Sequence, residues 1–310
     1  MNYNFEVREE DILETYVGDE ISAAQNYKRV MGSNHQGAPA IAAALGMRVE
    51  KVRRYLSGMK PRGIKGLDQL EAYGLFPVDL HSENFDLFHI LSCMAYWRGV
   101  VVSRNEGDAT MANTVLNPTS LAQQAFMKAF LAQSQIPCRT ISKGGLSVPN
   151  EISRLLVAAG HEVGMKSDNT STIPKYIEDA IKACEVTGDS NAVALVREFI
   201  QSMVFFRLKK YPEASMVHLF TLHDEGSARL QGELIHRAVR IGLPEVSTEL
   251  RGPYSSDGTF HTRIAFPTGN SLISSIRDTY AEEAFSALHG SGGESNLSVL
   301  DHGHWTDRKL

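Results

Sequence analysis

Two stretches of this chain are apolar on nearly every face of a helix. Positions 85 to 99 read FDLFHILSCMAYWRG, and positions 192 to 208 read AVALVREFIQSMVFFRL. A helix without a polar face is a buried one, and the first stretch is too short and too interrupted to span a bilayer. Each stretch has a small residue midway, Cys93 or Ser202, and each carries an arginine at its C-terminal end, Arg98 or Arg207. We therefore predict two buried helices at the centre of the fold.

The same order of elements follows each of these helices. The pattern after Arg98 predicts two strands, a capped helix that ends at Pro137, a short hairpin and another helix. After Arg207 the pattern predicts a strand, a helix that ends at Pro244, a longer hairpin and a helix near residue 270. The two arginines are 109 positions apart and the two prolines 107. This agreement predicts an internal repeat of two α-β-β-α-β-β-α units in an α+β protein.

This order of elements resembles the LAGLIDADG homing-endonuclease fold, over about residues 85 to 285. The resemblance implies two repeats related by a pseudo-twofold axis, one over residues 85–160 and one over residues 191–288. Residues 161–190 would form the linker and helix between them. Residues 289–310 contain a glycine- and serine-rich run, so we expect a disordered tail in which His302 and His304 are mobile rather than metal ligands.

The resemblance also places Arg98 and Arg207 where that family has its metal-binding aspartates. Hard divalent cations take carboxylate oxygens, whereas a guanidinium is a permanently charged donor without an acceptor. The substitution implies that the nuclease chemistry is lost, so we expect no catalytic residue, no metal site and no cofactor. Arginine suits phosphate, and an unpaired buried charge is costly. We therefore expect both side chains to be exposed on the sheet side or paired with acids or phosphate, as a phosphate clamp.

A second pattern lies nearer the N-terminus. Ala42, Gly46 and Val52 have the spacing of a helix-turn-helix, with helices predicted over 39–45 and 49–56. A glycine in the turn accommodates a positive φ. The apolar pattern places Val49, Val52 and Leu56 inward, so that the opposite face of the second helix would enter the major groove of DNA. We place this motif in a helical DNA-binding domain over residues 1–78.

The charge distribution supports DNA binding by the same segment. Residues 38–66 contain seven basic residues and one acid, a net charge of +6 in a chain of net charge −5. Nucleic-acid affinity comes largely from such local basic patches. The expected base contacts are Lys51 and Arg54, and the expected phosphate contacts are Arg48, Arg53, Lys60, Arg62 and Lys65. Pro61, Gly63 and Gly66 predict that the last three of these basic residues lie on a loop along the DNA backbone.

The repeats themselves carry less charge. Residues 85–285 contain 19 basic and 21 acidic residues, which is weak for a basic saddle. The predicted strands and hairpins of the repeats still contain polar residues that are candidate DNA contacts: Arg104, Asn113, Arg139, Lys143, His218, Arg251, His261 and Arg263. We expect each of them to be a solvent-facing strand residue rather than a base contact. Alternation over 260–266 puts His261 and Arg263 on one face of a strand.

Composition adds the setting. Hydrophobic content of 43% and charged content of 22% are ordinary for a soluble globular protein. The three cysteines are far apart and odd in number, and no signal peptide precedes them, which indicates a reducing cytoplasmic setting without a membrane. No phosphate loop, dinucleotide fingerprint or zinc-protease motif is present in the sequence.

These observations predict a sequence-specific double-stranded DNA-binding protein derived from a homing endonuclease, acting in transcription regulation. Because both repeats lie in one chain, a monomer suffices. Two alternatives stay open. One is an active endonuclease that uses other acids, and the other is a scaffold whose repeats bind a protein or a small ligand.

Overall fold

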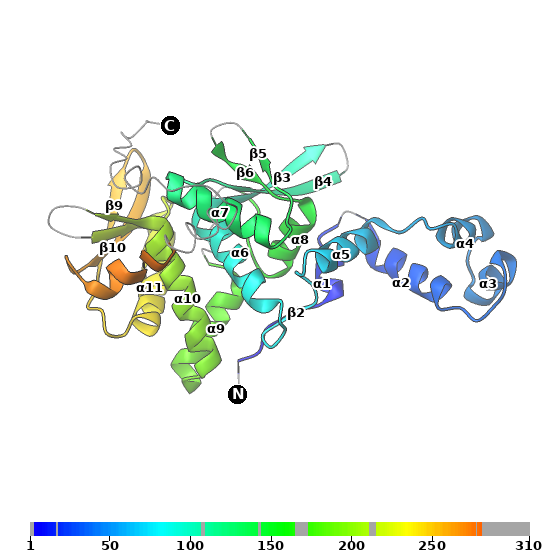
Figure 1. Ribbon diagram of the computed structural model, residues 1–310, viewed down its shortest axis with the longest axis horizontal. Coiled ribbons are helices and arrows are strands. Elements are labelled where there is room, and N and C mark those ends of the chain that lie inside the picture. Colours follow the sequence, from blue (N-terminus) through cyan, green and yellow to red (C-terminus); the bar gives the residue numbers. More distant parts are fainter. Residues whose placement is uncertain are drawn as a thin grey trace, which may run out of the picture.

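The computed structural model describes residues 3–16, 18–106, 109–141, 144–164, 173–210, 215–276 and 278–280. It confirms the predicted α+β class, because helices alternate with small antiparallel sheets. The described strands include two four-stranded sheets. In Figure 1 helices pack against both sheets, and a small helical tip projects from the end of the molecule that is away from them. The expected tail, residues 289–310, lies outside the described residues.

The first four-stranded sheet follows helix α6 in the chain. Its elements are, in order, α6 (Phe85–Arg98), β3 (Gly99–Glu106), β4 (Ala109–Leu116), α7 (Leu121–Gln133), β5 (Arg139–Thr140), β6 (Leu146–Ser147) and α8 (Asn150–Ala158). The strand order is β3-β4-β6-β5, and every pair is antiparallel. Ser120 begins α7 by accepting a hydrogen bond from the Gln123 amide at 3.2 Å, so this helix has the cap that its sequence predicts.

The second four-stranded sheet follows helix α10. Its elements are, in order, α10 (Ser190–Arg207), β7 (Leu208–Lys210), β8 (Ser215–His218), α11 (Glu225–Gly242), β9 (Glu249–Ser256) and β10 (Thr259–Phe266). Helical turns follow over residues 271–276. The strand order is β7-β8-β10-β9, again antiparallel throughout. Counted from its opening helix, each sheet therefore has the same strand order.

The two opening helices pack against each other in the centre of the molecule (Figure 1). Trp97 of α6 is fully buried, and its indole Nε1 donates to the backbone carbonyl of Phe199 in α10 at 3.2 Å. The Trp97 and Phe199 rings also lie 4.8 Å apart. Large aromatic side chains bury much apolar area, and a buried indole needs a hydrogen-bond acceptor. Both predicted buried helices are thus present, joined by an aromatic contact near the C-terminal end of α6.

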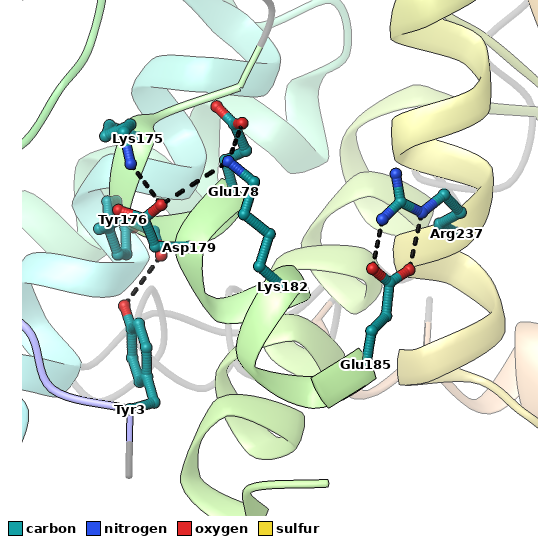
Figure 2. Close-up of polar contacts among 8 residues, drawn as sticks. All are labelled: Tyr3, Lys175, Tyr176, Glu178, Asp179, Lys182, Glu185 and Arg237. Carbon is teal, nitrogen blue, oxygen red and sulfur yellow. Dashed lines mark hydrogen bonds and ion pairs between the residues drawn. The ribbon is translucent and has the colours of Figure 1, made fainter. Parts of the chain in front are cut away.

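Helix α9 (Lys175–Thr187) lies along α10 and is tied to the rest of the fold at both ends (Figure 2). Near its N-terminus the Tyr3 hydroxyl donates to the carbonyl of Tyr176 at 2.8 Å. Near its C-terminus Glu185 accepts two hydrogen bonds from Arg237 of α11, one of them 2.7 Å long. Between these ends, Lys182 pairs with Glu178 on the solvent face. The helix therefore links the N-terminal segment to the second half of the chain.

The N-terminal residues belong to the same core as the two sheets. Strand β1 (Glu6–Val7) pairs with β2 (Val78–Asp79), and the Phe5 ring lies 5.5 Å from that of Phe88 in α6. Helices α1 (Glu9–Leu13) and α5 (Arg62–Ala72) also contribute buried residues to this core. The segment 1–78, which the sequence suggests as one domain, is thus divided between the main core and a smaller one.

The smaller core defines the tip of the molecule, which consists of α3 (Ala38–Leu45), α4 (Val49–Leu56) and the C-terminal half of α2 (Glu20–Met31). Its buried residues are Val30, Ala38, Ile41, Ala42, Val52 and Tyr55. Gly46 ends α3 with φ of 66°, the left-handed conformation for which glycine is best suited. In Figure 1 the tip projects away from both sheets.

Two details of this region differ from the sequence-based expectations. Residues 60–66 are not an extended basic loop, because α5 begins at Arg62. The glycines in this stretch serve close packing instead, since a Cβ on Gly63 would lie 2.2 Å from Leu13 and one on Gly66 would lie 1.9 Å from the Tyr16 hydroxyl. Leu56 is also not inward-facing but 46% exposed, and Tyr55 takes the buried position.

Candidate nucleic-acid interface

Helix α4 and the residue before it present basic side chains to solvent. Val52 and Tyr55 pack inward, and the Tyr55 ring lies 5.4 Å from that of Tyr27 in α2. The exposed basic residues are Arg48, Lys51, Arg53 and Arg54. Within the described part of the chain, none of these four forms an ion pair with an acid. Their charges are therefore available to phosphate groups.

The three basic residues near the start of α5 are arranged differently. Arg62 and Lys65 are exposed on the first turn of the helix. Lys60 instead donates to the Asp68 carboxylate at 2.7 Å, and this ion pair raises the pKa of Lys60. A lysine that already pairs with a neighbouring carboxylate contributes less free energy to the binding of a phosphate group. Of the seven predicted DNA contacts, Lys60 is the weakest candidate.

Arg98 and Arg207 meet where α6 and α10 end. Arg98 is partly buried, and its Nε donates to the carbonyl of Phe206 at 2.7 Å. Its Nη2 donates to the same oxygen, as does Nε2 of Gln123 at 3.0 Å. The last carbonyls of a helix have no partner within the helix, so Arg98 supplies donors to the end of α10. Burial, together with the charge of Arg207, lowers the pKa of Arg98 to about 9.

Arg207 is held by the second sheet rather than by α6. Its Nη2 donates to the carbonyl of His218 in β8 at 2.8 Å, and its guanidinium lies 4.6 Å from the centroid of the Phe220 ring. Burial lowers the pKa of Arg207 to about 10, and Tyr96 partly opposes this shift. Both arginines thus remain protonated at neutral pH.

The predicted environment of this arginine pair is therefore corrected. The two side chains are neither fully exposed nor paired with acids among the described residues, because backbone carbonyls accept their hydrogen bonds. Each carbonyl carries only a partial negative charge, so two formal positive charges stay uncompensated at one place. Arg98 contacts the residue that precedes Arg207, so the two arginines lie at neighbouring helix ends.

A patch of cationic and aromatic side chains adjoins Arg207 on the second sheet. We call it the outer patch, and it consists of Lys209, His218, Tyr254, His261 and Arg263. The His218 and His261 rings stack at 6.2 Å. The Arg263 guanidinium lies 4.8 Å from the centroid of the Tyr254 ring and 3.1 Å from Nε2 of His261. Thr262 and Ile264 point to the core instead, so the predicted alternation along β10 holds as far as Ile264, whereas Ala265 is buried too.

The positive charges of the outer patch lower the pKa values of its histidines. Burial first, and then the charges of Arg263, Lys209, His261 and Arg207, lower the pKa of His218 to about 4. Burial and Arg263 also lower the pKa of His261. These shifts show a positive local potential, which an anion would relieve. Aromatic faces interleaved with cations suit a nucleic-acid backbone and its bases.

The other strand candidates are less suitable. Arg251 is held by Glu249 at 2.7 Å, and the Asn113 side chain accepts a hydrogen bond from Ser147 at 3.1 Å. Arg139 is exposed on β5. The side chain of Arg104 and the whole of Lys143 lie outside the described residues. Sequence reasoning missed Lys209, although it lies two residues after Arg207 at the start of a strand.

Other classes of site receive no support from the described residues. Among them, no group of three or more histidine, cysteine, aspartate or glutamate side chains could hold a metal ion. The search of the described helices for a segment long and apolar enough to cross a membrane found none. Comparison with known proteins gives no match to any family model, curated protein or solved structure.

Proposed function

We propose that this chain is a double-stranded DNA-binding protein with a degenerate LAGLIDADG-like core that has lost its nuclease chemistry, and that it regulates transcription. The observation that carries the proposal is the position of Arg98 and Arg207. They lie at the ends of the two opening helices, where the family resemblance places metal-binding aspartates, and Arg98 donates to the carbonyl of the residue before Arg207. A donor-only, cationic pair there favours phosphate over a divalent cation.

The order of elements supports the degenerate LAGLIDADG-like core. Each half begins with a buried helix, and each sheet has the same strand order when counted from that helix. The two opening helices pack on each other, as a pseudo-twofold arrangement requires. Because both halves lie in one chain, a single molecule would supply both halves of the interface.

Two surfaces of one molecule would then contact the same DNA duplex. The tip would act as a helix-turn-helix, with Lys51 and Arg54 reading bases and Arg48 and Arg53 contacting phosphates. The arginine pair and the outer patch would contact the backbone at a second place. Binding through two surfaces on one chain raises the overall affinity without requiring either surface to be strong.

The experiment that tests this proposal is a salt titration of duplex binding by fluorescence anisotropy, in EDTA, with genomic fragments enriched by pull-down as ligands. Arg53→Ala should lower the slope of log K against log salt by about one and weaken binding to all sequences. Arg54→Ala should cost about 1–3 kcal/mol and relax the preference at one base position. Lys60→Ala is the matched control, because Asp68 already holds this lysine.

Removing the whole N-terminal segment is a poor test, because Phe5 and its neighbours belong to the main core. A full-length variant with alanine at Arg48, Lys51, Arg53 and Arg54 avoids this problem, since all four side chains are exposed. If that variant binds duplex DNA as tightly as the wild type does, the tip is not the DNA-binding surface. Metal-dependent cleavage of plasmid DNA would instead support an active endonuclease.

A further inference from the structure

A cavity of about 270 Å³ lies between α6 and α10, beside the helical turns near residue 280. Its lining residues come from four separate parts of the chain. Asp86, His89, Ile90 and Cys93 belong to α6, and Glu198, Gln201, Ser202 and Phe206 belong to α10. Phe126, Thr279 and Tyr280 complete the wall. The volume suits a small molecule of roughly ten to fifteen non-hydrogen atoms.

The floor of the cavity is polar but carries no charge. His89 is fully buried, and burial lowers its pKa to about 4, so the ring is neutral at pH 7. Its Nδ1 lies 3.0 Å from the Tyr176 hydroxyl, which donates to Ser92 at 2.7 Å. Burial raises the pKa of Cys93 to about 12, which keeps the thiol protonated. Both groups can therefore contribute hydrogen bonds without attracting or repelling charge.

The mouth of the cavity is acidic. Asp86 is exposed in the first turn of α6, and the Glu198 side chain is 53% exposed. Burial first, and then the charge of Asp86, raises the pKa of Glu198. The two carboxylates are thus close enough to repel, and neither has a basic partner of formal charge among the described residues. A cation placed between them would relieve the repulsion.

The Glu198 carboxylate also reaches the floor. Its Oε2 lies 3.7 Å from Nε2 of His89, which is too long for a direct hydrogen bond. At this distance, a charged ion pair would require a protonated ring, which the burial of His89 disfavours. Because the Cys93 thiol already lies 3.7 Å from Nε2 of His89, an N–H donor in the cavity would be bound by the Glu198 carboxylate oxygen.

The side walls are aromatic. Phe126 and Phe206 line the cavity, with their ring centroids 6.1 Å apart. Tyr280 lies 5.6 Å from Phe126 and stacks on Phe205 at 5.0 Å. Aromatic faces attract organic cations and exclude hydrated metal ions, and they disfavour anions. The wall therefore selects for a ligand with an apolar body as well as a positive charge.

From these features we infer that the cavity binds a small organic ammonium ion, with its charged group between Asp86 and Glu198 and its apolar body against Phe126, Phe206 and Tyr280. The inference does not rest on DNA binding and can be tested without DNA. The cavity is distinct from the arginine pair, although the Phe206 carbonyl on the same residue accepts hydrogen bonds from Arg98.

The test is isothermal titration calorimetry of the full chain with three ligands of the same size: 2-phenylethylammonium, phenylacetate and 2-phenylethanol. We expect 2-phenylethylammonium to bind with Kd below about 1 mM and the other two to bind at least about tenfold more weakly. Glu198→Gln should reduce the affinity for the ammonium ion at least about tenfold. Asp86→Asn should reduce it too, and Glu233→Gln, an exposed site on α11, should leave it unchanged.

Glu198 and Asp86 lie at the mouth of the cavity, so both variants should keep the wild-type melting curve, which is recorded alongside. Equal binding of 2-phenylethylammonium and phenylacetate would overturn the inference, as would Glu198→Gln with unchanged affinity. Absence of binding by all three ligands up to about 10 mM would overturn it as well.

Discussion

The guanidinium of Arg98 donates to the backbone carbonyl of Phe206, the residue before Arg207, with an Nε–O distance of 2.7 Å. This contact joins the C-terminal end of α6 to that of α10. It brings Arg98 to the end of the helix that carries Arg207, with no ion pair to an acid among the described residues, and it shares a helix-end carbonyl with the Gln123 side chain. The arginine pair is thus both a structural link and a site of positive charge.

We predict that Arg98→Ala lowers the free energy of unfolding by about 1–3 kcal/mol, because it removes two donors from a partly buried carbonyl. Arg98→Ala combined with Arg207→Ala should also weaken DNA binding in EDTA. Urea denaturation measures the first effect and anisotropy the second. Arg229→Ala is the control, since Arg229 is exposed on α11 and pairs with Glu225. If the folded double variant binds DNA with unchanged affinity, the two arginines do not act as a phosphate clamp.

A pH dependence of stability is expected from His89. Burial lowers its pKa in the folded state to about 4, below the unfolded value near 6.5. Between about pH 6.5 and about pH 4, His89 is protonated in the unfolded chain but stays neutral in the folded protein. The free energy of unfolding therefore falls as the pH drops from about 6.5 to about 4. The loss should reach up to about 3 kcal/mol, and above pH 7 the contribution is constant.

Urea denaturation at several pH values measures this effect. His89→Gln should be less stable at pH 7, because the buried hydrogen bond to Tyr176 changes, but its stability should lose this component of the pH dependence. His35→Gln, in an exposed loop, should keep the wild-type slope. A His89→Gln variant with the full wild-type slope would show that other groups cause the acid loss.

The outer patch provides a matched pair of arginines on one sheet. Among the described residues, Arg263 contacts Tyr254 and His261 and forms no ion pair, whereas Arg251 is held by Glu249 at 2.7 Å. We expect Arg263→Ala to reduce duplex affinity several-fold and to lower the salt slope by about one, because one phosphate contact is lost. Arg251→Ala should have a much smaller effect. Equal losses in the two variants would mean that net charge, not the patch, controls binding.

Close packing at the end of α6 gives a prediction about Gly99. A Cβ at this position would lie 2.7 Å from the carbonyl oxygen and 2.9 Å from the Cα of Ala95, and backbone atoms cannot move aside cheaply. Gly99→Ala should therefore destabilise the fold by about 1–3 kcal/mol, measured by chemical denaturation. Gly226→Ala, in the first turn of α11, should cost less, because its Cβ would meet a side-chain oxygen of Asp224, at 3.1 Å, rather than backbone atoms.

Much of the secondary structure was predictable because it depends on local chemistry. The apolar runs at Phe85–Arg98 and Ser190–Arg207 produce buried helices, since no face of either is polar enough to meet water. The cap at Ser120 and the positive φ at Gly46 are likewise properties of single residues and their neighbours. The α+β class and the bounds of α4 followed from such patterns, and α3 begins one residue before its predicted start.

Other features depend on which elements meet in space, and the sequence pattern does not contain that information. Leu56 is exposed because Tyr55, packed on Tyr27, already fills the inward position. Gly63 lies in helix α5 and not in a loop. A glycine is needed there because a side chain would collide with Leu13, fifty positions away in the chain. Lys60 meets Asp68 only once α5 has formed.

The sequence by itself determined where the helices lie, where the positive charge gathers at the tip and which two arginines stand at the ends of the opening helices. Only the tertiary structure decided what those arginines bind and what surrounds them. Backbone carbonyls hold Arg98 and Arg207, and the cavity lined by Asp86, Glu198, Phe126 and Tyr280 exists because four distant segments pack together. The reason is physical: helix formation follows local periodicity, whereas hydrogen-bond partners and cavities depend on contacts between residues far apart in the chain.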